Sequence, residues 1–375
     1  MVAGFIRVAT ASALLVAAGL SAGCHSQNLR KVAHLLPDQR SRYVVPLPAG
    51  FPLPLVPGDN ALTAEKVALG RRLFYDKRLS LNETYSCGSC HQQSKAFTDG
   101  RTHAVGSTGA EHYRNTMSLI NAVYSPAYTW ADPSVRTFEE QLLVPLTNVH
   151  PVELGFAGRL PELERRLRSD VRYRELFARS FPSDDEPVTV GNVARAIASF
   201  ERTIISGRSP FDRMLHDGDV EAMSPAALRG MRVFLSARAA CSTCHSGFDF
   251  CGNVTTAESP PKPAAFRNTG TWDGQSSDSG LASVTHRNAG LGRFRIPTLR
   301  NIAVTGPYMH DGRFATLDEV IDHYAAGGPP RPGQKLDIKP FLITPTEKRD
   351  LIEFLNSLTD REVLTDGRLG EAGSG

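Results

Sequence analysis

The chain has 375 residues, of which 41% are hydrophobic and 22% are charged, as in an ordinary soluble globular protein. Its formal net charge is only +3, so the composition gives no reason to expect nucleic-acid binding. The length suggests two modest domains after removal of a leader.

An export signal is predicted over residues 1–23. Arg7 is the only charge before the apolar run 8–20, which is too short to cross a bilayer as a mature helix. A Leu-Ser-Ala-Gly run before Cys24 resembles a lipobox, and cleavage there would leave a lipid-anchored N-terminus. The alternative is simple secretion with cleavage after Ala22. Both interpretations place the protein outside the cytoplasm, in the periplasm.

Residues 24–60 are rich in proline, which predicts an extended tether followed by an arm that wraps around the protein. Helical signals begin at Thr63, a good N-cap residue.

Two Cys-x-x-Cys-His runs, 154 residues apart, carry the most information. Such a run is typical of covalent haem attachment, in which both thiols form thioethers and the adjacent His is the proximal iron ligand. A zinc site built from two cysteine pairs is the alternative, but it does not explain a His directly after both pairs. We therefore predict two covalently bound haem c groups. The residues are Cys87, Cys90 and His91 in the first run and Cys241, Cys244 and His245 in the second.

A weak internal repeat precedes the two runs. Gly70 lies four residues before Phe74 ahead of the first run, and Gly230 lies four residues before Phe234 ahead of the second. This repeat suggests two related haem domains, each built like a small cytochrome c.

The predicted fold class is all-α with long irregular loops, because no segment has a convincing strand pattern. Helices are predicted over 190–206, from Thr316 with Glu319 completing a capping box, and over 346–358. The predicted organisation is a first cytochrome c-like domain at 61–213, a second at 214–360 with an irregular excursion over 252–295, and a flexible tail at 361–375.

Four further motifs accompany the haem runs: Thr98–Arg101, Pro151–Gly155, Pro297–Asn301 and Met309–Gly312. With them, residues 60–360 resemble the bacterial dihaem cytochrome c peroxidase and MauG superfamily, and most closely its MbnH-like dihaem enzymes. The resemblance implies a peroxide-dependent oxidoreductase. In the MbnH-like group, the type member oxidises a tryptophan of a copper-binding partner protein to kynurenine.

The resemblance implies that the first haem reacts with peroxide. Glu153 matches the superfamily's distal acid/base, and Gln141 and Pro145 match its neighbours, although the Pro-to-Glu spacing is two residues longer here. A distal carboxyl can shuttle a proton during O–O cleavage. Trp130 matches the bridging tryptophan between the haems. His103 either blocks the first iron at rest or is an ordinary loop residue.

The second haem separates the subgroups. Peroxidases of the superfamily carry a Met ligand fourteen residues after the His that matches His310, and this chain has Tyr324 there. A phenolate is a hard anionic donor that stabilises ferric and higher iron states more than a thioether does. Tyr324 is therefore the expected ligand opposite His245, with Met309 as a rival ligand and helix packing as the simpler role for Tyr324.

The relatives also hold a calcium ion, whose ligands would match the side chain of Asn115 and the carbonyls of Thr305 and Pro307. Side-chain and carbonyl oxygens suit Ca²⁺, although these residues also suit ordinary turns. Cys251 is expected to be a buried, inert thiol.

Three functions follow from the sequence. The first is a MauG/MbnH-like oxidase that uses hydrogen peroxide to form a high-valent dihaem state and then oxidises a partner protein. The second is a dihaem cytochrome c peroxidase that takes electrons from a small cytochrome c or a cupredoxin. The third is a dihaem electron carrier without enzymatic activity.

Overall fold

The computed structural model describes residues 42–259, 262–329 and 334–371. The signal peptide, Cys24 and the first part of the tether lie outside these residues. Among the described residues, no helix is long and apolar enough to cross a membrane.

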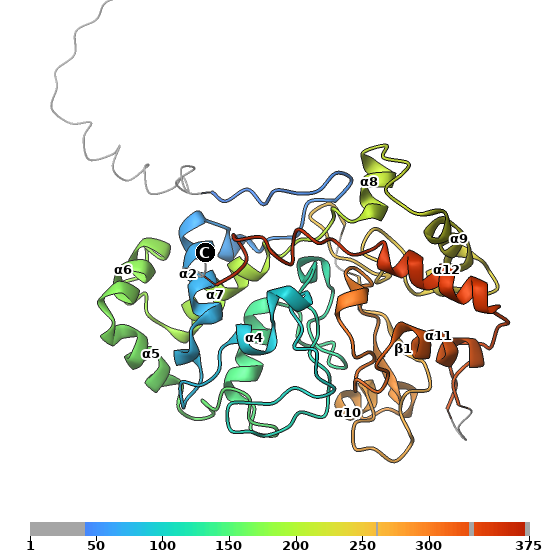
Figure 1. Ribbon diagram of the computed structural model, residues 1–375. Coiled ribbons are helices and arrows are strands. Elements are labelled where there is room, and N and C mark those ends of the chain that lie inside the picture. The colour runs from blue at the N-terminus through green and yellow to red at the C-terminus, as the bar shows by residue number, and fades with distance from the viewer. Residues whose placement is uncertain (1–41, 260–261, 330–333, 372–375) are drawn as a thin grey trace, which may run out of the picture. The chain divides into compact units, whose positions relative to one another are not determined.

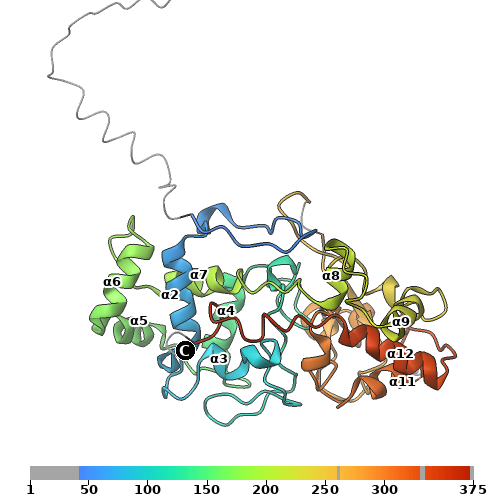
Figure 2. The ribbon, with the colours of Figure 1, turned by 45° about the horizontal axis from the view of Figure 1, so that its top comes forward.

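Five helices gather around the first haem run (Figures 1 and 2). Thr63 caps the first of them as predicted, because its hydroxyl oxygen accepts from the Lys66 N–H at 3.2 Å. Their apolar faces meet in one buried cluster that includes Leu69, Phe74 and Phe200. The helices are α2 (Ala64–Tyr75), α4 (Phe138–Thr147), α5 (Leu160–Ser169), α6 (Val171–Ser180) and α7 (Val190–Glu201).

Four helices surround the second haem run in the same way: α8 (Pro210–His216), α9 (Pro225–Leu235), α11 (Leu317–Ala326) and α12 (Pro345–Asn356). The predicted capping box of Thr316 and Glu319 is confirmed at the start of α11. Two predicted bounds were wrong, because α7 ends at Glu201 and α12 begins one residue earlier than expected, with Thr344 as its N-cap.

The repeated glycines mark matching helix crossings. A Cβ on Gly70 of α2 would lie 1.8 Å from the carbonyl oxygen of Ala196 in α7. A Cβ on Gly230 of α9 would lie 1.8 Å from the carbonyl oxygen of Asp350 in α12. Only glycine permits backbones to approach so closely, so the repeat identifies the same crossing in both halves.

A small sheet departs from the expected all-α class. Strands β1 (Phe266–Asn268) and β2 (Arg293–Arg295) pair antiparallel, with Phe266 opposite Arg295. The sequence did not predict them because three-residue strands carry too little alternation to detect. Helices are the commonest regular elements of the described residues, and this two-stranded sheet lies inside the irregular segment.

The remaining regular elements are short. Cys87–Cys90 forms the single turn α3, and Leu281–Thr285 forms α10. The 3₁₀ turns are η1 (Gly58–Asn60), η2 (Lys77–Leu79), η3 (Gln93–Lys95), η4 (Ala122–Tyr124), η5 (Cys241–Thr243), η6 (Asn288–Gly290) and η7 (Ile302–Val304).

The proline-rich arm lies along the protein. Over residues 42–60 it contacts both halves of the chain. The Tyr124 hydroxyl donates to the Pro52 carbonyl at 2.8 Å, and Phe51 packs on Phe248 with 4.8 Å between ring centroids.

The predicted flexible tail needs correction over residues 361–371, which pack against the first haem run (Figures 1 and 2). Val363 and Leu369 are buried in the apolar cluster around α2. The Gln93 amide donates to the carbonyls of Val363 and Asp366, both at 2.9 Å. Two buried apolar side chains and these hydrogen bonds offset the entropy of ordering the segment.

The described residues from 42 to 371 form one compact unit. Each haem run has its own apolar cluster, but the division into domains at 61–213 and 214–360 stays a prediction.

Candidate dihaem site

The first haem run presents its histidine ready to bind a metal. His91 follows α3, and its Nδ1–H donates to the carbonyl of Phe97 at 2.8 Å, which leaves Nε2 free. Ala96 and Phe97 adopt left-handed backbone conformations, with φ of 51° and 60°, that turn this carbonyl back toward the ring. Burial lowers the pKa of His91, against the opposing effect of the Phe97 and Met117 carbonyls, so the ring is neutral, as a metal ligand must be.

The second run repeats this arrangement. The Nδ1–H of His245 donates to the carbonyl of Phe250 at 2.8 Å, and Phe250 also has a left-handed backbone, with φ of 51°. Burial lowers the pKa of His245 as well. Sequence reasoning missed these carbonyls, although a Phe stands six residues after the first His and five after the second.

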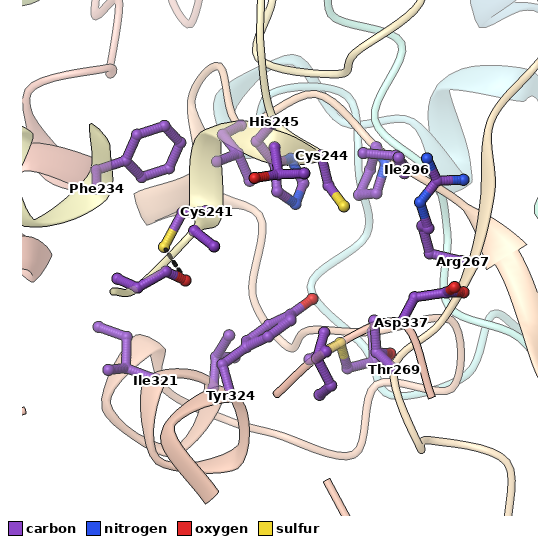
Figure 3. A pocket seen from close by; sticks show the side chains of 18 of the residues that line it. Phe234, Cys241, Cys244, His245, Arg267, Thr269, Ile296, Ile321, Tyr324 and Asp337 are labelled. Carbon is purple, nitrogen blue, oxygen red and sulfur yellow. Dashed lines mark hydrogen bonds between the residues drawn. The ribbon is translucent and has the colours of Figure 1, made fainter. Parts of the chain in front are cut away.

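A cavity of about 570 Å³ adjoins the second run. Cys241, Cys244 and His245 form one wall, and Tyr324 projects from α11 on the opposite wall (Figure 3). Its volume is typical of a cofactor site, and its walls combine two free thiols, an imidazole and mainly apolar side chains. These residues fit a covalently attached haem. The apolar walls include Phe234, Phe294, Ile296, Leu299, Ile321 and Leu355.

Tyr324 and Met309 both line this cavity, so the expected ligand and its rival face the same space. Desolvation raises the pKa of the Tyr324 hydroxyl, which favours the neutral phenol until a cation is present. Met309 has a left-handed backbone, with φ of 74°. His310 stacks on Phe294 with ring centroids 3.5 Å apart, and burial lowers its pKa to about 4.

The predicted distal residues of the first haem lie around one loop. The carbonyl of Pro145 in α4 accepts from the Leu154 N–H at 2.9 Å, which fixes the loop beside the helix. Gln141 lies one turn before Pro145 on the same side of α4. The Glu153 carbonyl accepts from the Ser107 N–H at 2.8 Å. The structure thus brings Pro145 and Glu153 together, while their catalytic roles stay predictions.

The Glu153 side chain faces the first haem run and one histidine. Its Oε1 lies 3.6 Å from Nε2 of His112, whose Nδ1 is buried without a partner. Burial raises the pKa of the Cys90 thiol to about 12, and the charges of Asp99 and Glu153 add to this rise. A carboxylate therefore lies within electrostatic range of Cys90.

His103 lies in the neighbouring hairpin, where its Nδ1 is 3.5 Å from Oε1 of Glu111. A small cavity of about 210 Å³ separates that hairpin from Cys90 and is lined by Asp99, Arg101 and Val105. A role for His103 as a blocking ligand stays a prediction.

Trp130 connects the surroundings of the two runs. It lines the second cavity, and its indole N–H donates to the carbonyl of Asn115 at 2.9 Å. Asn115 is two residues from Met117, whose carbonyl adjoins His91. The role of Trp130 as a bridge between the two haems stays a prediction.

Asn115, the proposed side-chain ligand of calcium, contacts a residue near the two proposed carbonyl ligands, but the calcium role of all three stays a prediction. The Asn115 N–H donates to the carbonyl of His310 at 2.7 Å, and His310 stands three residues after Pro307. The Asn115 amide donates to the Arg101 carbonyl at 2.7 Å. The described residues contain no cluster of three His, Cys, Asp or Glu side chains that could hold a metal, so a calcium ion here would depend on carbonyl and amide oxygens.

Comparison with known proteins identifies the family. Residues 64–220 match the model of the di-haem cytochrome c peroxidase family. The chain is 36% identical to the methylamine utilization protein MauG of Methylorubrum extorquens over 80% of both chains. It is 37% identical to a cytochrome c peroxidase of Denitromonas iodatirespirans over 85% of this chain and 87% of that protein. The chain therefore belongs to the dihaem cytochrome c peroxidase and MauG family.

A solved structure extends the likeness. A MauG-like protein associated with microbial copper homeostasis matches with a TM-score of 0.83 and 38% identity, over 88% of this chain and 99% of that one. Membership of the family makes this protein a dihaem oxidoreductase that acts on peroxide, with two haem c groups. The prediction of an electron carrier without enzymatic activity is thereby set aside.

Proposed function

We propose that the protein uses hydrogen peroxide to oxidise a partner protein, in the manner of MauG and the MbnH-like enzymes. The two Cys-x-x-Cys-His runs would hold the two haem c groups, which would supply the redox chemistry with peroxide. The observation that carries the proposal is Tyr324, which faces His245 across the second cavity (Figure 3). An anionic oxygen ligand favours oxidised iron, which suits storage of an oxidising equivalent more than uptake of an electron.

The polypeptide would contribute proton transfer and a path for charge. Glu153 lies at the first run with His112 within 3.6 Å, so a proton could move between a carboxylate and an imidazole there. Trp130 lines the second cavity and donates to the Asn115 carbonyl, and it would offer an aromatic relay between the two runs. The protein substrate would be oxidised through the protein matrix, with no need to reach either iron.

The proposed partner is a secreted copper-binding protein, and the proposed reaction is oxidation of one of its tryptophans to kynurenine. The similarity to a MauG-like protein associated with microbial copper homeostasis supports this choice. The proposed location is the periplasm, with an anchor at a lipidated Cys24, and the proposed Ca²⁺ ligands are Asn115, Thr305 and Pro307.

Substitution of Tyr324 tests the proposal. In Tyr324→Phe, we expect the ferric optical and EPR spectra of one haem to change, and the near-infrared band that follows stoichiometric peroxide to be lost, because the phenolate donor is gone. Tyr308→Phe is the matched control, since Tyr308 lines the same cavity but donates its hydroxyl to the Ile302 carbonyl at 3.1 Å. Unchanged spectra in Tyr324→Phe would contradict the proposal.

Substitution of Glu153 tests the proton-transfer role. Glu153→Gln should slow the reaction of the diferric protein with peroxide by about 10²- to 10⁴-fold, the usual contribution of a positioned acid/base group. Stopped-flow absorption at the haem Soret band measures this rate. Glu111→Gln is the control, because Glu111 is an exposed carboxylate of the adjacent hairpin. Equal rates in Glu153→Gln and the parent would remove Glu153 from the mechanism.

A dihaem cytochrome c peroxidase is the second candidate, and Met309 favours it because this thioether lines the same cavity as Tyr324. It predicts fast steady-state peroxide reduction with a small cytochrome c or a cupredoxin as donor. Negligible turnover with such donors, together with oxidation of a tryptophan in the partner, would exclude it.

A further inference from the structure

Arg295 is a cation placed against the second cavity. It ends strand β2, and its backbone N–H donates to the Trp130 carbonyl at 2.8 Å, which fixes the strand there. Arg295 lines the cavity, and the Nε of its guanidinium is enclosed by protein. Desolvation lowers the pKa of Arg295, against the opposing charges of Cys251 and Asp249.

The guanidinium has no carboxylate partner among the described residues. One Nη donates to the Ser125 hydroxyl at 2.8 Å, and the other lies 4.0 Å from the Met117 sulfur. Its Nε is buried and has no hydrogen-bond partner. The nearby Asp249 carboxylate accepts instead from Asn121 at 2.8 Å. The positive charge of Arg295 therefore contacts only two neutral groups, the Ser125 hydroxyl and the Met117 sulfur.

Three other enclosed arginines of the described residues are paired with carboxylates. Arg114 forms a two-pronged contact with Asp278, and Arg202 forms one with Glu139. Arg300 donates to Asp212 at 2.5 Å. Because an uncompensated charge in a protein interior is costly, the lack of a carboxylate partner at Arg295 indicates an anion in the cavity that this residue lines.

We propose that Arg295 binds a propionate carboxylate of the second haem. Haem c carries two propionates, and a guanidinium without a carboxylate partner matches a carboxylate in shape and charge. Three other cations line the cavity. Arg238 pairs with Glu347, Arg267 donates to the Phe266 carbonyl at 3.1 Å and lies beside Asp337 (Figure 3), and Lys339 is exposed to solvent. This assignment does not depend on which substrate the enzyme oxidises.

The same guanidinium reaches the surroundings of the first haem run. Met117, which it contacts, adjoins His91 through its carbonyl. Arg295 would thus fix the second haem against the segment that supports the first. Its positive charge would also favour the reduced form of the second haem, which carries one more negative charge than the oxidised form.

Spectroelectrochemical titration of the dihaem protein tests the proposal. In Arg295→Gln, one of the two midpoint potentials should fall, so that its ratio of reduced to oxidised haem at fixed potential drops at least tenfold, or 59 mV for one electron. That potential should also become dependent on pH between about 5 and 8, because an unpaired buried propionate takes up a proton on reduction. Arg295→Lys, which keeps the charge, should shift the ratio less.

Arg293→Gln is the matched control, because Arg293 belongs to the same strand and carries the same charge but pairs with Asp337 at 2.9 Å. Its potentials should stay within twofold of the parent ratios. Parent-like potentials and pH dependence in Arg295→Gln would overturn the assignment. If Arg295→Gln does not retain both haems, the propionate bending bands of Arg295→Lys decide by resonance Raman: a shift supports the assignment, and unchanged bands overturn it.

Discussion

Glu201 is a carboxyl group enclosed in the helix pack around the first haem run. It lies near the end of α7 with 4% of its surface exposed, and its Oε2 is buried without a partner. Burial raises the pKa of Glu201 to about 8, and the neighbouring charge of Glu139 adds to this rise, while Arg202 opposes it. The side chain is therefore neutral in the folded protein at pH 7.

This raised pKa predicts a dependence of stability on pH. Between pH 4.5 and pH 8 the folded protein holds a proton on Glu201 that the unfolded chain releases, so its contribution to stability falls as pH rises, by at most about 1.4 kcal/mol per pH unit. Glu201→Gln removes this dependence. In urea unfolding at pH 5, 6.5 and 8, the free energy of unfolding of the variant should rise relative to that of the parent as pH rises.

The exposed Glu175 of α6 provides the control, since Glu175→Gln should follow the parent at every pH. A constant difference between Glu201→Gln and the parent across this range would show that Glu201 does not titrate as described.

At the scale of elements, the two halves are held by equivalent helix crossings. In α2 against α7 and in α9 against α12, a glycine lets one helix backbone contact the other. The apolar residues Phe74 and Phe234 then lie buried one turn further along. A glycine at the helix crossing and a buried phenylalanine four residues later therefore occur in both halves of the protein.

Gly230→Ala should destabilise the protein by at least about 2 kcal/mol, because the added methyl group overlaps the Asp350 carbonyl and the helices must separate. Thermal unfolding of the dihaem protein measures this loss. Gly191→Ala in α7 is the control, since its methyl group would meet only the Thr189 hydroxyl at 3.8 Å and alanine favours the helix. Similar losses in both variants would argue against the crossing.

The elements also show how far the sequence predicts the protein. The haem runs, the caps at Thr63 and Thr316 and the repeated glycines were predictable, because each depends on residues close together in the chain. The short strands, the Phe97 and Phe250 carbonyls and the isolation of Arg295 were not. The two carbonyls depend on left-handed backbone conformations, and the isolation of Arg295 depends on which distant residues lie near it in the fold. Neighbouring residues in the sequence do not predict either property.

At the scale of the molecule, the chain returns to the first haem run at its end. After α12, residues 361–371 cross from the second apolar cluster to the first (Figure 2). Tyr75 donates to the Leu369 carbonyl at 2.8 Å, and Arg71 donates to Gly370 at 2.6 Å. The tail is therefore part of the first haem's surroundings.

Removal of residues 361–375 should destabilise the protein by about 3–5 kcal/mol, the value of burying Val363 and Leu369. The loss should appear as faster proteolysis near α2 and a lower thermal midpoint. Removal of residues 372–375 alone, beyond Leu369 and its contacts, is the control and should leave both unchanged. Equal protease resistance in the two truncations would contradict the packing role of the tail.

Because the tail packs on the first haem run, the first half of the protein can be completed only after the second half has been made. A chain is made and exported from its N-terminus, so the surface beside Gln93 waits for the last residues to arrive. The first haem run can accept its cofactor early, yet its surroundings close only after the second run has followed. Completion of the first haem site therefore depends on synthesis of the second half of the chain. A chain that ended before residue 361 would leave the first haem run exposed to solvent and proteases.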